Sequence, residues 1–325
     1  MTGGTAKRVL KSLLVGLVLA IAAGTIVHGK ASTVVLKLSW AKKFRNQLSI
    51  DAQVTVLALN AGKEDDGDSH GGSRVNAAGL PMVAEILNGT APAQAAARAK
   101  LAPGGQPKKA VYGAWRLWFE HPPPGGATQC QVFTGQPAAI CDQQPHGADS
   151  NPSHSFEIHP VFAVDGISIG RTSLVLTADN ESVKETDKAF ADYTGTNKIL
   201  TIVRSSTALT LTMISVQNNY VRMKLRVTHV KTATTRQKDG TVDGGFVLAD
   251  ILSSSDEHVV LRSNARVFYF KDSQPGDALN TAAVGDEFTV IGMPRMDLDA
   301  VLRGSEGKQT SSFKVPFEFI VVAMG

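Results

Sequence analysis

The sequence predicts a mainly β protein, with two small β-barrels in tandem, short helices and an N-terminal segment ahead of the barrels. Three observations support this prediction. Short apolar or alternating runs of strand length recur along most of the chain. Turn signals such as Asp239-Gly240 and Asp243-Gly244 separate these runs. The length of 325 residues, of which 43% are hydrophobic, is sufficient for two cores.

Residues 1–31 have the pattern of a targeting signal. Basic residues precede an uncharged apolar run, Ser12–Val27, and Gly29-Lys30-Ala31 fits a cleavage site. The 16-residue run is short for a membrane span, which usually takes about 20 residues. A signal peptide is therefore favoured, and the alternative is an uncleaved anchor that contacts the membrane through residues 10–27. Either interpretation predicts an exported protein that is periplasmic, secreted or membrane-anchored.

Residues 32–165 are expected to form the first barrel. The predicted strands of this domain are Val34–Trp40, Gln53–Leu59, Met82–Leu87, Val111–Phe119 and His154–Val164. Alanine-rich Asn88–Lys100 is expected to be a short helix, with Thr90 as its N-cap. The prolines that begin at Pro122 end the fourth strand, because proline cannot continue a central strand.

Residues 166–325 are expected to form a second β-rich domain that begins with a helix at Glu181–Tyr193. The strands that we predict there are Lys198–Val203, Ala208–Val216, Tyr220–Val230, Gly245–Leu252, Val259–Leu261, Val267–Phe270, Glu287–Gly292 and Phe313–Ala323. Arg222, Lys224 and Arg226 share one face of a predicted strand. Such a row could meet phosphate, but a solvated outer face is the favoured interpretation.

Charge and motifs narrow the function classes only partly. The net charge of +4 comes from 33 basic and 29 acidic residues, so it does not by itself indicate nucleic-acid binding. The sequence contains no P-loop, dinucleotide fingerprint, nucleophile elbow or CxxC motif, which argues against the commonest enzyme classes. The two cysteines, Cys130 and Cys141, predict a disulfide in an exported chain, worth about 3 kcal/mol.

Two segments concentrate acidic and histidine residues. Asp66, Asp68 and His70 alternate in the first, and Glu157 and His159 do so in the second, so each set would share one face of a strand. Further residues that could join them are Glu85, Glu120 and His121. If the strands face a common cleft, their side chains would suit a divalent metal: Mg²⁺, Mn²⁺ or Ca²⁺ for carboxylates alone, Zn²⁺, Mn²⁺ or Fe²⁺ with imidazole. The alternative is a solvated acidic turn at Asp66-Gly67 and a Glu–His pair that anchors a loop.

Trp115, Arg116 and Trp118 are the remaining candidates for a binding site. They could stack on a base or a sugar, which would make nucleic acid or an oligosaccharide the partner. The favoured alternative is core packing of both tryptophans beside an exposed arginine.

Three blocks carry a resemblance to a family of uncharacterised exported bacterial proteins. They are Glu64–Ile86 (EDDGDSHGGSRVNAAGLPMVAEI), Gly113–Pro122 (GAWRLWFEHP) and Asn151–Val161 (NPSHSFEIHPV), and the family has them in the same order. The resemblance is close over roughly residues 45 to 165 and implies kinship without an assigned activity. A weaker similarity to OB-type barrels, including staphylococcal-nuclease-like ones, implies an OB-like fold for both domains and metal-ligand candidates at Asp66 and Asp68. The arginines and the glutamate of such nucleases have no match at the corresponding spacing.

Three functions are compatible with these patterns. The first is an exported β-barrel module that binds a metal ion, an oligosaccharide or nucleic acid. The second is a divalent-metal-dependent, phosphodiesterase-like hydrolase, in which Asp66, Asp68, His70 and Glu157 hold the ion and His159 or His154 is the general base. The third is a structural envelope protein in which Glu157 and His159 bond the acidic loop and Arg116 pairs with Asp68 or Glu120.

Overall fold

The computed structural model describes most of the chain beyond the N-terminal segment. The described residues are 31–60, 67–74, 80–104, 108–123, 127–131, 149–169, 183–237 and 239–325. The predicted signal or anchor segment, Asp66 and Cys141 lie outside these ranges, so the predictions made for them stay predictions. Among the described helices, none has the length and apolar character needed to cross a membrane.

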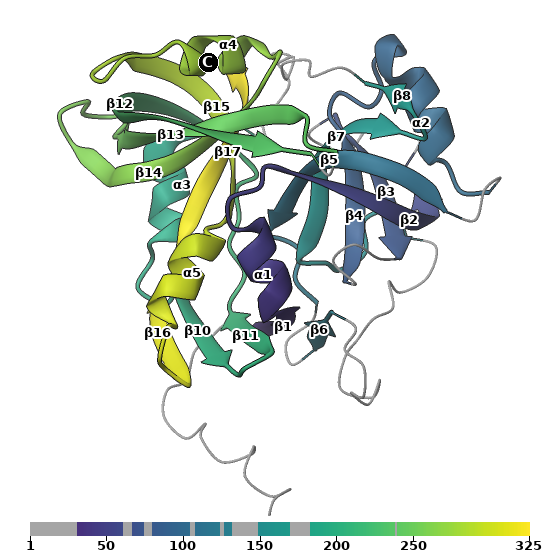
Figure 1. The fold of residues 1–325 in the computed structure, drawn as a ribbon, viewed down its shortest axis with the longest axis horizontal. Helices are drawn as coiled ribbons and strands as arrows, with labels where there is room; N and C mark the ends of the chain where they lie inside the picture. The colour runs from purple at the N-terminus through teal and green to yellow at the C-terminus, as the bar shows by residue number, and fades with distance from the viewer. Residues whose placement is uncertain are drawn as a thin grey trace, which may run out of the picture.

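Five strands of the N-terminal half close into the first barrel (Figure 1). They are β2 (Ser49–Leu59), β3 (Ser69–Arg74), β4 (Pro81–Ile86), β5 (Lys109–Leu117) and β7 (Phe156–Val164). Around the barrel the order is β2-β3-β4-β7-β5, and β5 returns to β2. Only β4 and β7 run parallel to each other. A short strand, β8 (Ile167–Ser168), extends the sheet beside β7.

A second closed barrel in the C-terminal half repeats this topology. Its strands are β12 (Tyr220–Arg236), β13 (Val242–Leu252), β14 (Val260–Phe270), β15 (Glu287–Met296) and β17 (Phe317–Met324). They are ordered β12-β13-β14-β17-β15 before closing on β12, and only β14 and β17 are parallel. Outside the barrel, β9 (Val183–Glu185) pairs with β12.

The two barrels also place their helices alike. Between the third and fourth strands lie η1 (Pro92–Gln94) and α2 (Ala95–Leu101) in the first barrel and α4 (Gln274–Asn280) in the second. Two five-stranded barrels with one strand order are OB-like. The predicted fold class, two small β-barrels in tandem with short helices, is confirmed.

A third sheet connects segments that lie far apart in the sequence. Its order is β16 (Thr310–Lys314), β10 (Ile199–Arg204), β11 (Ala208–Met213), β1 (Ser32–Lys37) and β6 (Thr128–Cys130). Both barrels contribute the segment between their fourth and fifth strands, which supplies β6 to one edge and β16 to the other. Because β1 pairs with β11 along its whole length, the N-terminal strand is held by the middle of the chain (Figure 1).

The helix after β1 corrects one sequence prediction. The predicted strand Val34–Trp40 ends at Lys37, and α1 (Leu38–Phe44) follows at once. The helical turn brings Leu38, Trp40, Ala41 and Phe44 into contact with the core. Trp40 packs on Phe44 at 4.7 Å between ring centroids. Alternation in the sequence could not reveal this turn, because the residues on both sides of it are apolar.

Both helices that the sequence predicts are present in shorter form. The alanine-rich segment is helical from Pro92 to Leu101, and α3 (Thr186–Tyr193) lies within the predicted Glu181–Tyr193 helix. Two further helices, α4 and α5 (Leu298–Gly304), were not predicted, because only strands were expected beyond residue 198.

The basic row on β12 is a paired, solvated face. Arg222 contacts Glu185 at 2.8 Å, and Lys224 contacts Glu257 at 2.6 Å. The third member, Arg226, contacts Glu287 at 2.9 Å. The interpretation of this row as an outer face is therefore confirmed.

Strands β5 and β7 of the first barrel pack closely at Gly113. A Cβ atom there would lie 2.4 Å from the carbonyl oxygen of Pro160 and 2.6 Å from Cγ2 of Ile158. We therefore expect Gly113→Ala to lower the free energy of unfolding by about 1–3 kcal/mol, measured by urea denaturation. Gly195→Ala is the control, because its nearest neighbour is a side-chain oxygen at 3.3 Å. Equal stability of the two variants would contradict the close packing of β5 on β7.

Candidate functional site

The structure brings most of the predicted site residues together in one buried group. This acidic–histidine cluster consists of Asp68, His70, Glu85, Arg116, Glu120, His154, Glu157 and His159. Its members come from β3, β4, β5, β7 and the adjoining loops of the first barrel. His121 lies at the edge, where its exposed ring stacks on His154 with 5.5 Å between centroids. Asp66 lies outside the described residues.

Strand pairing explains why residues from separate segments meet. His70 lies opposite Glu85 on the antiparallel strands β3 and β4, and their side chains are 3.4 Å apart. On the parallel pair β4 and β7, Ala84 lies opposite Ile158, so the next residues along, Glu85 and His159, are neighbours. Closure of the barrel therefore creates the cluster.

His159 is at the centre of the cluster. Its Nδ1 lies 2.8 Å from Oε2 of Glu85, and its Nε2 lies 3.3 Å from Oδ2 of Asp68. Burial opposes a charge on this ring, but Glu85 and hydrogen bonds with Asp68 and Glu157 outweigh it and hold the pKa of His159 well above 6.5. The imidazolium form is therefore the favoured one at neutral pH.

Glu157 is the second centre of the cluster. It accepts a hydrogen bond of 2.6 Å from Nη1 of Arg116, and Nε2 of His154 lies 3.1 Å from its other oxygen. Burial would raise the pKa of Glu157, but Arg116 and the two histidines keep it well below 4.5. Arg116 also donates to Glu120 at 3.0 Å. Glu157 is therefore a carboxylate held by one guanidinium and by imidazoles.

Burial closes the cluster to solvent, except at the half-buried Glu120. Asp68, Arg116, His154 and His159 have exposed fractions of 0%, and His70, Glu85 and Glu157 of no more than 4%. Arg116 is thus not the exposed residue of the core-packing alternative. The indoles of Trp115 and Trp118 are 0% and 1% exposed, so no base or sugar ring can stack on them in this conformation.

The cluster contains two sets of potential metal ligands. In each set the donor atoms lie within 4.8 Å of one another: Asp68, Glu85 and His159 in one, Glu85, His154 and Glu157 in the other. Carboxylate and imidazole donors suit Mn²⁺, Zn²⁺ or Fe²⁺. A metal in the first set would have to displace the proton from His159, because a protonated imidazole cannot be a ligand. The arrangement can therefore hold either imidazolium ions or a divalent ion.

The sequence prediction missed Tyr220, which links the cluster to the second barrel. Its hydroxyl donates to Oδ2 of Asp68 at 2.5 Å and lies 2.8 Å from Nε2 of His159. Tyr220 is the first residue of β12, more than sixty positions beyond His159 in the sequence. No local pattern marks it, because only the docking of the barrels makes it a neighbour.

A matching buried network in the second barrel was also missed. Arg295 donates to Glu318 at 2.6 Å, and the pair spans the fourth and fifth strands, as Arg116 and Glu157 do in the first barrel. The sequence around the two glutamates is similar: Phe156-Glu157-Ile158 and Phe317-Glu318-Phe319. This repeated Phe-Glu, with an arginine on the preceding strand, is the signal that could have revealed the duplication.

The two arginines make reciprocal contacts across the barrel interface. Nε of Arg116 donates to the carbonyl oxygen of Pro294 at 2.9 Å, and Nη1 of Arg295 donates to that of Trp115 at 3.3 Å. Each acceptor is the residue that precedes the other arginine. The guanidinium of Arg295 also lies 3.9 Å from the ring centroid of Trp115. The barrels are thus docked with a local two-fold pseudosymmetry.

A second pair of contacts follows the same pattern. Tyr220 begins the first strand of the second barrel and bonds Asp68, which directly precedes the second strand of the first barrel. Ser49 begins the first strand of the first barrel and donates to Asp243, near the start of the second strand of the second barrel. Each barrel therefore offers a hydroxyl to an aspartate of the other.

Tyr220→Phe tests the link between the barrels. The change removes the hydroxyl from two buried partners, Asp68 and His159, and we expect it to lower the free energy of unfolding by about 1–3 kcal/mol. Tyr112→Phe is the matched control, because that hydroxyl lies at the longer distance of 3.3 Å from Asp243 on a half-buried residue. Denaturant titration of both variants makes the comparison, and a smaller loss for Tyr220→Phe than for Tyr112→Phe would contradict this account.

Protonation of Glu318 makes the stability of the protein depend on pH. Burial raises the pKa of Glu318 to about 7 despite Arg295 and Arg266. The folded state therefore binds the proton of this carboxyl group more tightly than the unfolded state, in which its pKa is 4.5. Stability from this group therefore decreases as pH rises from 4.5 to about 7. The raised pKa of His159 acts in the same direction above 6.5.

We expect a higher melting temperature near pH 5.5 than near pH 8, measured by calorimetry across this range. Glu318→Gln should flatten the part of the profile below pH 7, whereas Glu306→Gln, at an exposed position, should leave it unchanged. A melting temperature that rises steadily toward pH 8 would be inconsistent with a proton held by Glu318.

Comparisons with known proteins add no family to this description. No protein-family model matches the sequence, and no curated protein or solved structure is similar enough to count as a match. The resemblance to exported bacterial proteins therefore remains a prediction. The conclusions about function rest on the geometry of the two barrels and of the cluster in the first barrel.

Proposed function

We propose that this protein is a non-catalytic binding module in which two OB-like barrels act as one rigid body. In this proposal the acidic–histidine cluster is a structural ion network rather than an active site. The cluster then has the structural role considered from the sequence, and the chain as a whole is the exported β-barrel binding module. Export of the protein is part of the proposal and rests on the sequence of residues 1–31 alone.

The observation that carries the proposal is the burial of the cluster together with its pairing. A general base must reach the proton that it removes, either directly or through one water molecule. His154 and His159, the two candidate bases, are each 0% exposed and face carboxylates. Their imidazolium forms offset the charge of Glu85 and Glu157, as a buried carboxylate requires.

The contacts between barrels support a rigid body. Arg116 belongs both to the cluster and to the interface, because its Nε reaches Pro294 in the second barrel. Arg295 in turn reaches the carbonyl oxygens of Gln47, Leu48 and Trp115. Breaking such a contact would leave a guanidinium buried without a partner, which is strongly unfavourable. The two barrels should therefore unfold together.

The metal-dependent hydrolase is the second candidate, and the two potential ligand sets favour it. It requires a divalent ion in place of the imidazolium protons. It also requires an opening to the cluster large enough for a substrate. Metal content and stability distinguish the two candidates.

The decisive experiment combines elemental mass spectrometry with thermal unfolding. We expect protein purified without chelator to contain no stoichiometric divalent ion. We expect Asp68→Ala and His159→Ala each to lower the free energy of unfolding by about 3–5 kcal/mol, because each breaks a buried pair. His258→Ala, at an exposed histidine, is the control and should change stability little.

The opposite result is equally clear. A stoichiometric ion that is lost in both variants, with melting temperatures equal to that of the unaltered protein, would overturn the structural role. Hydrolysis assays with that ion would then be the next step.

A further inference from the structure

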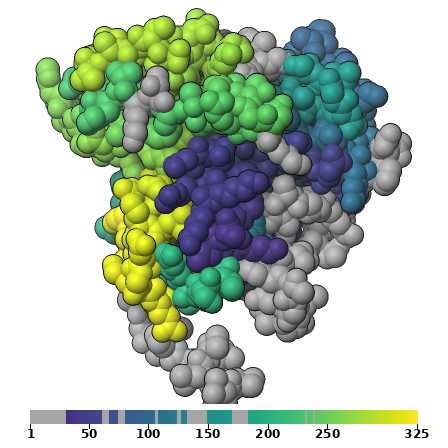
Figure 2. Space-filling view, in the orientation of Figure 1, coloured from purple at the N-terminus to yellow at the C-terminus, as the bar shows by residue number. Residues whose placement is uncertain are grey.

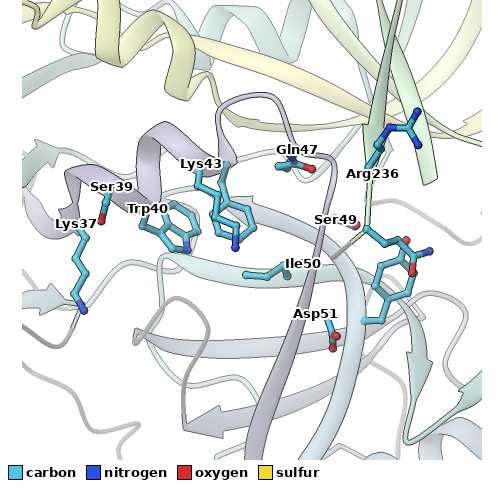
Figure 3. A pocket seen from close by; sticks show the side chains of 12 residues that line it. Lys37, Ser39, Trp40, Lys43, Gln47, Ser49, Ile50, Asp51 and Arg236 are labelled. Carbon is cyan, nitrogen blue, oxygen red and sulfur yellow. The ribbon is translucent and has the colours of Figure 1, made fainter. Parts of the chain in front are cut away.

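A groove with a volume of about 670 Å³ lies at the surface where the two barrels meet (Figure 3). One wall is α1, with Trp40 and Lys43, and the floor is the start of β2, with Ile50. The other wall is the end of β12, with Arg236. Figure 2 shows the N-terminal segment (purple) at the surface beside the second barrel (green). The volume of the groove is within the range of small-molecule binding sites.

Both barrels are needed to form this groove. Ser49 and Tyr112 of the first barrel line it, and both hydroxyls donate to Asp243 of the second barrel. Arg236 is positioned by the hairpin at the end of β12, where its Nη1 donates to the carbonyl oxygen of Gly240 at 2.7 Å. The rigid docking that we propose for the barrels is therefore what gives the groove its shape.

The charged side chains around the groove favour an anion. Lys37 and Lys43 lie on the α1 side, and Arg236 lies on the opposite side. Asp51 is the one acidic residue among the groove-lining residues that the structure describes. Cations on two sides of a concave surface would attract and orient a ligand that carries more than one negative charge.

The uncharged lining favours hydroxyl groups on the ligand. Ser39, Gln47 and Gln237, which carry hydroxyl and amide groups, are among the residues that line the groove. The indole Nε1 of Trp40 is buried and has no hydrogen-bond partner among the described residues, so an acceptor on a ligand could satisfy it. Tyr112, which is half-buried, offers a single ring as a platform.

We propose that this groove binds an acidic oligosaccharide, with Lys43 and Arg236 contacting carboxylates on successive sugar units. This inference rests on the proposed function and names its ligand class. Single-stranded nucleic acid fits less well, because it requires several open aromatic faces. Trp40 and Phe44 are only 7% and 8% exposed and pack on each other. One available ring and many hydrogen-bonding groups suit sugars better than bases.

Calorimetric titration of the full chain with a galacturonic acid tetrasaccharide tests the inference. The matched probe is the carboxyl-reduced form of the same tetrasaccharide, which keeps the linkages and loses the charge. We expect the acidic form to bind at least about tenfold more tightly, since charged hydrogen bonds contribute most to such a contact. An oligothymidylate is the third probe and should bind more weakly than the acidic sugar.

Variants locate the binding to the groove. Lys43→Gln and Arg236→Gln should each raise Kd about tenfold. Lys42→Gln is the matched control, because Lys42 is the exposed neighbour of Lys43 on α1 and does not line the groove. Thermal unfolding should show that all three variants are as stable as the unaltered protein.

Several results would overturn the inference. They are equal binding of the acidic and reduced sugars, equal loss in Lys42→Gln, tighter binding of oligothymidylate, or no binding of any probe. The stability of the His159 and Asp68 variants and the metal content are measured separately and do not depend on these results. Failure of the groove is therefore distinguishable from failure of the structural role of the cluster.

Discussion

The reciprocal pairing of Arg116–Glu157 and Arg295–Glu318 is the interaction on which the rest of this structure depends. All four side chains are at most 2% exposed, so each charge relies on its partner and on backbone carbonyls of the opposite barrel. A buried ion without a partner is strongly unfavourable, whereas a paired one need not add stability over an apolar contact. Such pairs therefore specify one orientation of the barrels more than they stabilise it, and Tyr220 extends the same arrangement to Asp68 and His159.

Specification of one orientation has a consequence for binding. The groove between α1 and the end of β12 exists only while the two barrels keep their relative position, because Asp243 of one barrel anchors Ser49 and Tyr112 of the other. Buried ionisable residues are often read as an active site. Here the buried ion pairs fix the orientation of the two barrels, and this orientation shapes the groove. The groups that would contact a ligand in the groove are surface lysines, an arginine and amides.

The sequence predicted the strands more successfully than the partners of each side chain. Most predicted strands are present, because alternation of apolar residues reflects burial of one face. The clustering of Asp68, Glu85, Glu157 and His159 was foreseen from their concentration in two segments. The end of β1 at Lys37 was not, because Leu36 and Leu38 continue the apolar alternation across it. The helix α5 was also missed, although Asp297 is an N-cap residue that marks its start. Tyr220 was missed because no local pattern marks it, and Arg295 was missed because the repeated Phe-Glu that accompanies it was not recognised.

What the sequence by itself determined is therefore the mainly β fold class, the presence of two barrels and the residue types of the buried cluster. These features follow from local periodicity and composition, which act within a few residues of each position. Only the tertiary structure decided that Arg116 is buried, that Arg116 and Arg295 make reciprocal contacts across the barrel interface, and that a basic groove lies between the barrels. These features depend on the docking of distant segments, and no periodicity in the chain encodes which surfaces of two barrels will meet.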